Sequence, residues 1–163
     1  MKAKKIARIG LLTAMALVLS YLESLVPLSF AVPGIKMGLP NIVVVFALYR
    51  LRWQDAAGVS LVRVLLAALL FGSAFSLAYS GAGAVLSFLV MLLLKRSGRF
   101  GTTGVSVAGA VAHNLGQILV AVFVLETGRL VYYLPALCVS GTVAGVCVGL
   151  LAALLAKRVR LDD

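Results

Sequence analysis

Six apolar segments, separated by short polar breaks, follow one another along the 163 residues of the chain. They cover approximately residues 6–26, 37–51, 56–72, 75–94, 104–125 and 134–156. Because a helix of about 20 mainly apolar residues crosses a bilayer, this pattern predicts six transmembrane helices. The second segment is the shortest, and it could begin inside the protein rather than in lipid. The breaks leave no room for a soluble domain, so residues 1–163 are predicted to form a single all-α membrane domain, one compact helical bundle.

The composition agrees with an integral membrane protein, since 63% of the residues are hydrophobic and only 12% are charged. Basic residues before the first apolar segment could also mark a secretory signal. The segment continues past signal length, however, and no clear small-residue cleavage site follows it, so we expect the first helix to be retained.

The net charge of +10 has an uneven distribution along the chain. If the N-terminus is cytoplasmic, twelve basic residues fall on the cytoplasmic side and two, Lys36 and Arg129, fall outside. The twelve are Lys2, Lys4, Lys5, Arg8, Arg50, Arg52, Lys95, Arg96, Arg99, Lys157, Arg158 and Arg160. This asymmetry predicts a multi-pass protein of the cell membrane with both termini in the cytoplasm. It explains the basic excess by contact with membrane lipid and without a nucleic acid partner.

The fifth segment carries three polar residues near its middle. On a helix, His113, Asn114 and Gln117 share one side. Burying such groups in hydrocarbon costs several kcal/mol, so we expect this side to face a protein interior.

Three more polar residues, Glu23, Asn41 and Arg63, lie between the membrane midplane and the outer surface in the predicted orientation. Together with the three residues of the fifth segment they predict a ligand-binding cavity that opens to the outside. Residues 27–36 would form its roof.

Arg63 and His113 each have two interpretations. Arg63 could form an internal ion pair with Glu23, or it could meet an anionic group of a ligand, because guanidinium matches carboxylate and phosphate geometry. His113 could be a neutral imidazole hydrogen-bonded inside the bundle, or it could contact the ligand.

Small residues suggest close helix contacts in two places. Gly141, Gly145 and Gly149 form a stripe that predicts close packing of the last helix. In the first helix, small residues four apart indicate either packing within the bundle or a docking surface for another membrane subunit. These are Gly10, Ala14, Ala16 and Ser20.

Cys138 and Cys147 lie on one helix, too far apart to bond to each other. With a single histidine in the chain, no set of residues has the spacing of a metal site. We therefore predict no metal, no cofactor and no catalytic residue.

Several motifs resemble the Gx transporter family, which is also labelled heptaprenyl diphosphate synthase component I. They are YLESLVP at 21–27, FAVPGIKMGLPN at 30–41, SLVRVLL at 60–66, GAVAHNLGQ at 109–117 and YYLP at 132–135. The family in turn resembles the substrate-binding S components of energy-coupling factor (ECF) transporters. Those six-helix proteins capture a micronutrient at the outer face and couple to a scaffold subunit and two cytoplasmic ATPases. The resemblance implies that the six polar residues above line the pocket, and that small residues of the first helix contact a scaffold.

Two hypotheses follow for the function. The first is a membrane subunit that captures a small, anionic or amphipathic molecule from outside. The second is a non-catalytic accessory subunit of an isoprenoid, quinone or redox assembly. Catalysis is not expected, because the aspartates form no DDxxD cluster for magnesium and diphosphate, and there is no Walker loop for ATP.

Overall fold

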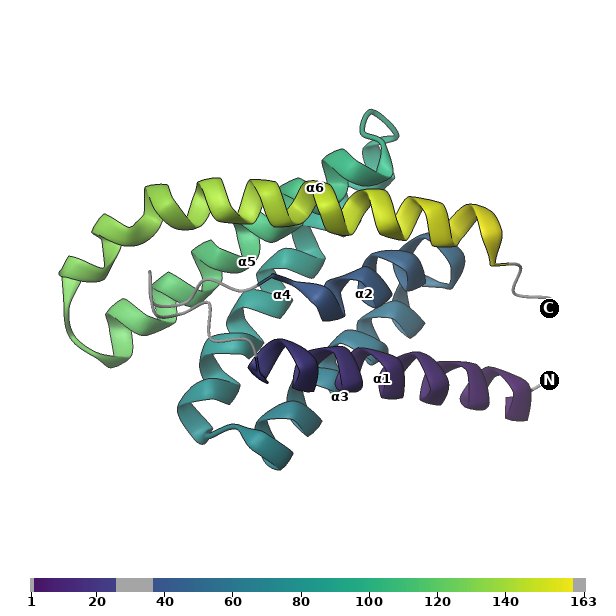
Figure 1. The fold of residues 1–163 in the computed structure, drawn as a ribbon, viewed down its shortest axis with the longest axis horizontal. Coiled ribbons are helices and arrows are strands. Elements are labelled where there is room, and N and C mark those ends of the chain that lie inside the picture. Colours follow the sequence, from purple (N-terminus) through teal and green to yellow (C-terminus); the bar gives the residue numbers. More distant parts are fainter. Residues whose placement is uncertain (1, 26–36, 160–163) are drawn as a thin grey trace.

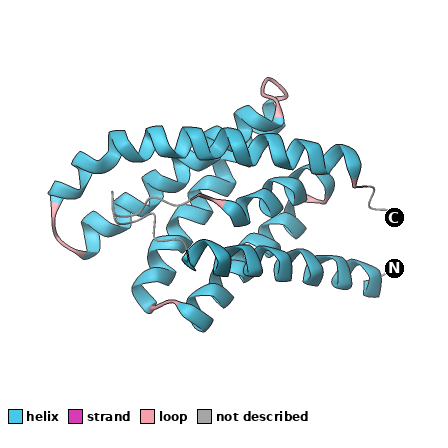
Figure 2. Ribbon diagram, in the orientation of Figure 1, coloured by secondary structure: helices cyan, strands magenta, loops and turns pink. Residues whose placement is uncertain are grey.

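The computed structural model describes residues 2–25 and 37–159 of the chain. Its helices are α1 (Lys2–Leu25), α2 (Leu39–Arg50), α3 (Trp53–Phe71), α4 (Ala74–Ser97), α5 (Thr102–Val124) and α6 (Leu134–Arg158), with the short 3-10 helix η2 (Gly128–Tyr133) before α6 (Figure 1). The described residues contain helices and loops but no strand (Figure 2). The predicted all-α class is therefore confirmed.

The helices form two groups that pack against each other. Helices α4, α5 and α6 pack in sequence order, and α1, α2 and α3 contact one another. Contacts between α2 and α6 and between α3 and α4 join the groups. In Figure 1, α6 and α1 run along opposite edges of the bundle with α2 between them, and both chain termini lie at the same end.

Helix α2 is the buried centre of this arrangement. It has 12 residues, so at 1.5 Å per residue it is about 18 Å long, well short of the ~30 Å hydrocarbon core of a bilayer. All six residues from 43 to 48 are buried, which leaves no continuous side for lipid. A helix that is apolar all round is either buried in a protein core or spans a membrane. By its length α2 is not among the five candidate spans, so the second segment is the exception among the six predicted transmembrane helices.

The other five long helices have the length and apolar character needed to cross a membrane. They expose large apolar side chains on their outer surfaces; Leu69 is 71% exposed, Leu119 65% and Phe123 86%. Water would disfavour so much apolar surface, whereas lipid tails accept it. These features identify a multi-pass membrane protein.

The glycine stripe of α6 lies directly against α5. A Cβ built on Gly145 would come within 2.7 Å of the Val107 Cα, and one built on Gly149 within 2.6 Å of the Thr103 Cα. No side chain fits at these points, so the two backbones approach closely. The predicted close packing of the last helix is confirmed.

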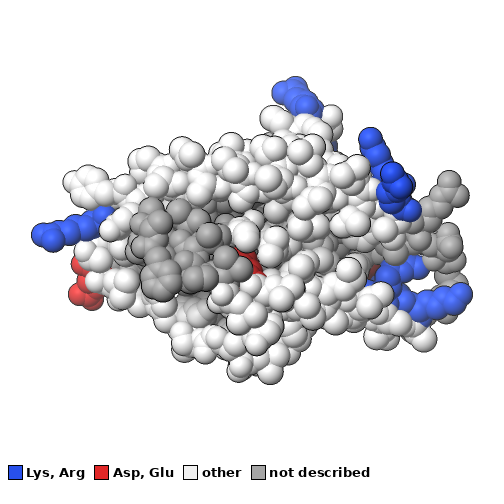
Figure 3. Space-filling model, in the orientation of Figure 1, with Lys and Arg blue, Asp and Glu red and all other residues white. Residues whose placement is uncertain are grey.

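Basic residues gather at the end of the bundle where both termini lie (Figure 3). Their contacts join helix ends that are distant in sequence. The Lys5 Nζ is 2.8 Å from the Asp55 carboxylate, the Arg50 Nη2 donates to the Val159 carbonyl, the Lys95 Nζ donates to the Leu48 carbonyl, and the Arg96 guanidinium lies over the Trp53 ring. We call this region the basic end. It brings together several of the residues that the charge asymmetry assigned to one side of the membrane.

Candidate ligand pocket

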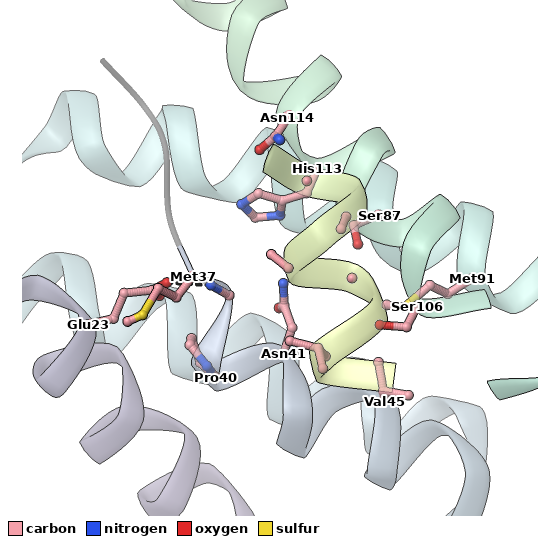
Figure 4. A pocket seen from close by; sticks show the side chains of 16 residues that line it. Glu23, Met37, Pro40, Asn41, Val45, Ser87, Met91, Ser106, His113 and Asn114 are labelled. Carbon is pink, nitrogen blue, oxygen red and sulfur yellow. Dashed lines mark hydrogen bonds between the residues drawn. The ribbon is translucent and has the colours of Figure 1, made fainter. Parts of the chain in front are cut away.

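A pocket lies where the end of α1 and the start of α2 meet the middle of α4, α5 and α6 (Figure 4). Its volume is about 40 Å³, which is room for roughly three water molecules or one small ligand. The residues that line it are Glu23, Met37, Gly38, Pro40, Asn41, Val45, Ser87, Met91, Ser106, Ala110, His113, Asn114, Gly141, Ala144, Gly145 and Val148. Polar side chains from four helices thus converge on one cavity.

Glu23 joins the end of α1 to the start of α2 at one side of the pocket. Its Oε1 accepts a hydrogen bond from the Gly38 backbone N–H. Gly38 precedes the first turn of α2 with φ 72°, a left-handed conformation that glycine adopts without strain. The carboxylate therefore satisfies a backbone donor that α2 itself cannot pair, and it holds the start of α2 in place.

Asn114 is positioned by α6. Its Nδ2 donates to the Leu137 carbonyl at 2.6 Å. A Cβ built on Gly141 would lie only 2.7 Å from this Nδ2, so the absence of a side chain at position 141 leaves space for the hydrogen bond. His113, the preceding residue on α5, lines the same pocket.

Four of the six predicted ligand-binding residues line this pocket: Glu23, Asn41, His113 and Asn114. Gln117 does not. It is 1% exposed and packs against α4, where a Cβ built on Gly83 would be 2.9 Å from the Gln117 Cγ.

Arg63 also lies outside the pocket lining. It is on α3, which packs against α1, α2 and α4, whereas the pocket lies on the side of α2 that faces α6. It is 8% exposed, and its Nε and Nη2 make no hydrogen bond within the described part of the chain. The Glu23 carboxylate acts on it through space, but these two residues form no salt bridge. A contact ion pair with Glu23, one of the two interpretations of Arg63, is therefore not present.

Two polar residues of the pocket were missed by the sequence analysis. Ser87 on α4 and Ser106 on α5 are each 3% exposed and line the pocket. Ser106 lies seven residues before His113, so helical periodicity could have placed it on the same side of α5. Ser87 had no comparable signal, because α4 contributes no other polar side chain to the pocket.

The small residues of α1 divide between two sides. Ala16 is fully buried, and Ser20 is buried with its hydroxyl donating to the Ala16 carbonyl. Gly10 and Ala14 are exposed, and a Cβ built on Gly10 would meet no atom within 4 Å. Only these two of the four predicted docking residues are at the surface.

The predicted roof, residues 27–36, lies outside the described residues.

Residues 12–155 match the family described as "Heptaprenyl diphosphate synthase component I". The chain belongs to this family. The matched range includes all the residues that line the pocket, so the pocket lies within the part that the family shares. The family name describes one component of a synthase. No curated protein and no solved structure matches the chain.

Over the described residues, no group of three or more His, Cys, Asp or Glu side chains could hold a metal ion.

Proposed function

We propose that this protein is a membrane subunit that captures a small molecule in the pocket between α1, α2, α4, α5 and α6. The observation that carries the proposal is the convergence of polar side chains from four helices on one cavity within an otherwise apolar bundle. Polar groups inside a membrane protein are costly, so they mark functional sites by default. Ligand pockets typically combine apolar walls with a few such groups.

The position of the pocket supports capture from the outer face. Glu23 is near the C-terminal end of α1, whereas the basic residues of α1 are at its start. Gly38 precedes the first residue of α2, at the opposite end from Arg50. The pocket mouth and the basic end are thus at opposite ends of these two helices. If the basic end is cytoplasmic, as basic residues next to membrane spans usually are, the pocket opens to the outside.

Transport by this subunit would depend on partners. The sequence has no Walker loop, so energy from ATP would come from separate cytoplasmic ATPases through a scaffold subunit, as in ECF transporters. Gly10 and Ala14 offer small residues on an exposed face of α1 where another helix could approach closely.

A second candidate is a non-catalytic membrane component of an isoprenoid, quinone or redox assembly. The family name supports it, and so do Arg63 and Gln117, which are buried away from the pocket. In this alternative the polar groups hold the bundle together and the functional surface is the one that meets a partner.

Native mass spectrometry of the protein purified gently from its own host distinguishes the two. The capture proposal predicts a small molecule bound to the wild type and lost from Asn41→Ala, which removes a pocket amide. Gln54→Ala is the matched control, because Gln54 is an exposed amide in the first turn of α3, outside the pocket.

An empty wild-type protein that is held to isoprenoid-synthesising or redox subunits would refute capture and favour the second candidate. A ligand that is retained equally by Asn41→Ala and by the control would show that the molecule binds elsewhere.

A further inference from the structure

The pocket has two chemically different sides. Figure 4 shows Glu23 and Met37 on one side and Ser87, Ser106 and Met91 on the other, with Asn41 between them. The first side carries a carboxylate. The second combines two hydroxyls with the apolar side chains of Met91, Val45 and Val148.

The two pocket hydroxyls lack the backbone partner that several other helical hydroxyls of this protein have. Serine and threonine in a helix commonly donate to a carbonyl one turn earlier. Thr13, Ser20 and Thr142 do so. Ser87 and Ser106 make no hydrogen bond within the described part of the chain, although both are 97% buried. A hydroxyl that lines a pocket and has no protein partner can pair with water or with a ligand.

The packing of α5 leaves space at these hydroxyls. A Cβ built on Gly109 would lie 3.2 Å from the Ser87 Oγ, and one built on Gly149 would lie 3.0 Å from the Ser106 Cβ. Because Gly109 on α5 and Gly149 on α6 have no side chain, Ser87 and Ser106 lie close to the backbone of the neighbouring helix.

The charges of the lining point to the class of ligand. Among the described residues that line the pocket, Glu23 is the acidic side chain and there is no lysine or arginine. Arg63, on which the expectation of an anionic ligand depended, is outside the lining; it interacts with Glu23 through space, but Glu23 is the charged group that borders the pocket. A carboxylate in a partly dehydrated pocket repels an anion more strongly than it would in water.

We propose that the pocket selects a small uncharged molecule, whose hydroxyl, carbonyl or amide group bonds to Ser87 and Ser106 while its apolar part packs on Met91 and Val148. Glu23 excludes anions and accepts a hydrogen bond from a donor on the ligand. This inference deepens the proposed capture function and rests on it, because only a protein that captures a molecule has a ligand to select. The chemistry of the pocket itself can be tested without knowing that ligand.

The test uses Ser87→Cys and Ser106→Cys, each made in the full chain with Cys138→Ala and Cys147→Ala. The purified proteins react in detergent with methyl methanethiosulfonate, which is neutral, and with its anionic sulfonatoethyl analogue. The rate of each reagent with a protein cysteine is divided by its rate with a free thiol in solution, which corrects for the different reactivity of the two reagents. Ser60→Cys is the control, because Ser60 is 4% exposed like the other two but lies outside the pocket on α3.

We expect the neutral reagent to modify both pocket cysteines and to leave the Ser60→Cys protein unmodified. The anionic reagent should be about tenfold slower at both pocket positions, because a unit charge meets the Glu23 carboxylate there. Adding Glu23→Gln should remove most of that difference. Glu126→Gln, which neutralises an exposed carboxylate beyond the end of α5, should not.

Equal rates for the two reagents, or a difference that Glu23→Gln leaves unchanged, would overturn the charge selection. A folded protein in which the neutral reagent reaches neither pocket cysteine, or reaches the Ser60→Cys control equally fast, would overturn the subsite. None of these results depends on a co-purifying molecule. A failure of this inference is therefore distinguishable from a failure of the capture proposal.

Discussion

Replacing Gly149 by alanine tests the closest contact between α5 and α6. The new Cβ would lie 2.6 Å from the Thr103 Cα, whereas ordinary van der Waals contact begins at 3.4 Å. The difference, 3.4 − 2.6 = 0.8 Å, must come from separating the two helices, because the obstacle is a backbone atom and not a flexible side chain.

Two opposing effects determine the size of the change. Overpacking of this kind typically costs about 1–3 kcal/mol. Alanine is also a better helix former than glycine by up to about 1 kcal/mol, which offsets part of that cost. Gly81→Ala isolates the second effect, because Gly81 is inside α4 and a Cβ there meets no atom within 4 Å. We expect Gly149→Ala to be less stable than Gly81→Ala by about 1–3 kcal/mol.

Equilibrium unfolding of both variants and the wild type in mixed detergent micelles, followed by circular dichroism, measures this difference. If Gly149→Ala were as stable as Gly81→Ala, the backbones of α5 and α6 could not approach as closely as the structure shows. The small-residue stripe would then not be the reason for their packing.

Three further predictions use the same unfolding measurement. Gly83→Ala should destabilise by about 1–3 kcal/mol, because its Cβ would lie 2.9 Å from both the Gln117 Cγ and the His113 backbone oxygen; an unchanged midpoint would show that α4 and α5 can separate here without loss. Arg63→Met should leave stability unchanged or raise it, since an apolar side chain of similar volume removes a buried charge that forms no salt bridge within the described part of the chain; a large loss would reveal a partner that the guanidinium needs. Asn114→Ala should cost about 1–3 kcal/mol, because it removes the buried hydrogen bond to the Leu137 carbonyl, and a neutral result would mean that water replaces it.

The sequence was sufficient to predict the helices but not the role of each one. The apolar segments gave the all-α class and the positions of the long helices, because length and hydropathy are local properties. The second segment was assigned as a span because apolar content alone does not separate a lipid-facing helix from a buried one. Its 12 residues and its unbroken burial from 43 to 48 depend on the packing of α1, α3 and α6 around it.

The candidate site could be predicted only in part for a similar reason. The face of α5 that carries His113 and Asn114 follows from helical periodicity, and the structure places both residues in the pocket. Arg63 was included because it lies at a similar depth in the membrane. Depth does not determine which side of a helix faces a cavity, and Arg63 is not among the residues that line the pocket. Ser87 was not found because a serine in an apolar helix is common. Its hydroxyl is of interest only because it makes no hydrogen bond to a backbone carbonyl of its own helix, and the sequence does not show this.

Helix α2 connects the pocket to the basic end of the bundle. At its start the Gly38 N–H donates to Glu23 in the pocket, and near its end the Leu48 carbonyl accepts from Lys95 at the basic end. Both contacts are made by charged side chains of other helices, and they use backbone groups that helix ends leave unpaired. Since residues 43 to 48 are buried, α2 is held at both ends and has no surface exposed to lipid along its middle. The shortest α-helix therefore links the pocket to the end of the protein that carries most of its positive charge.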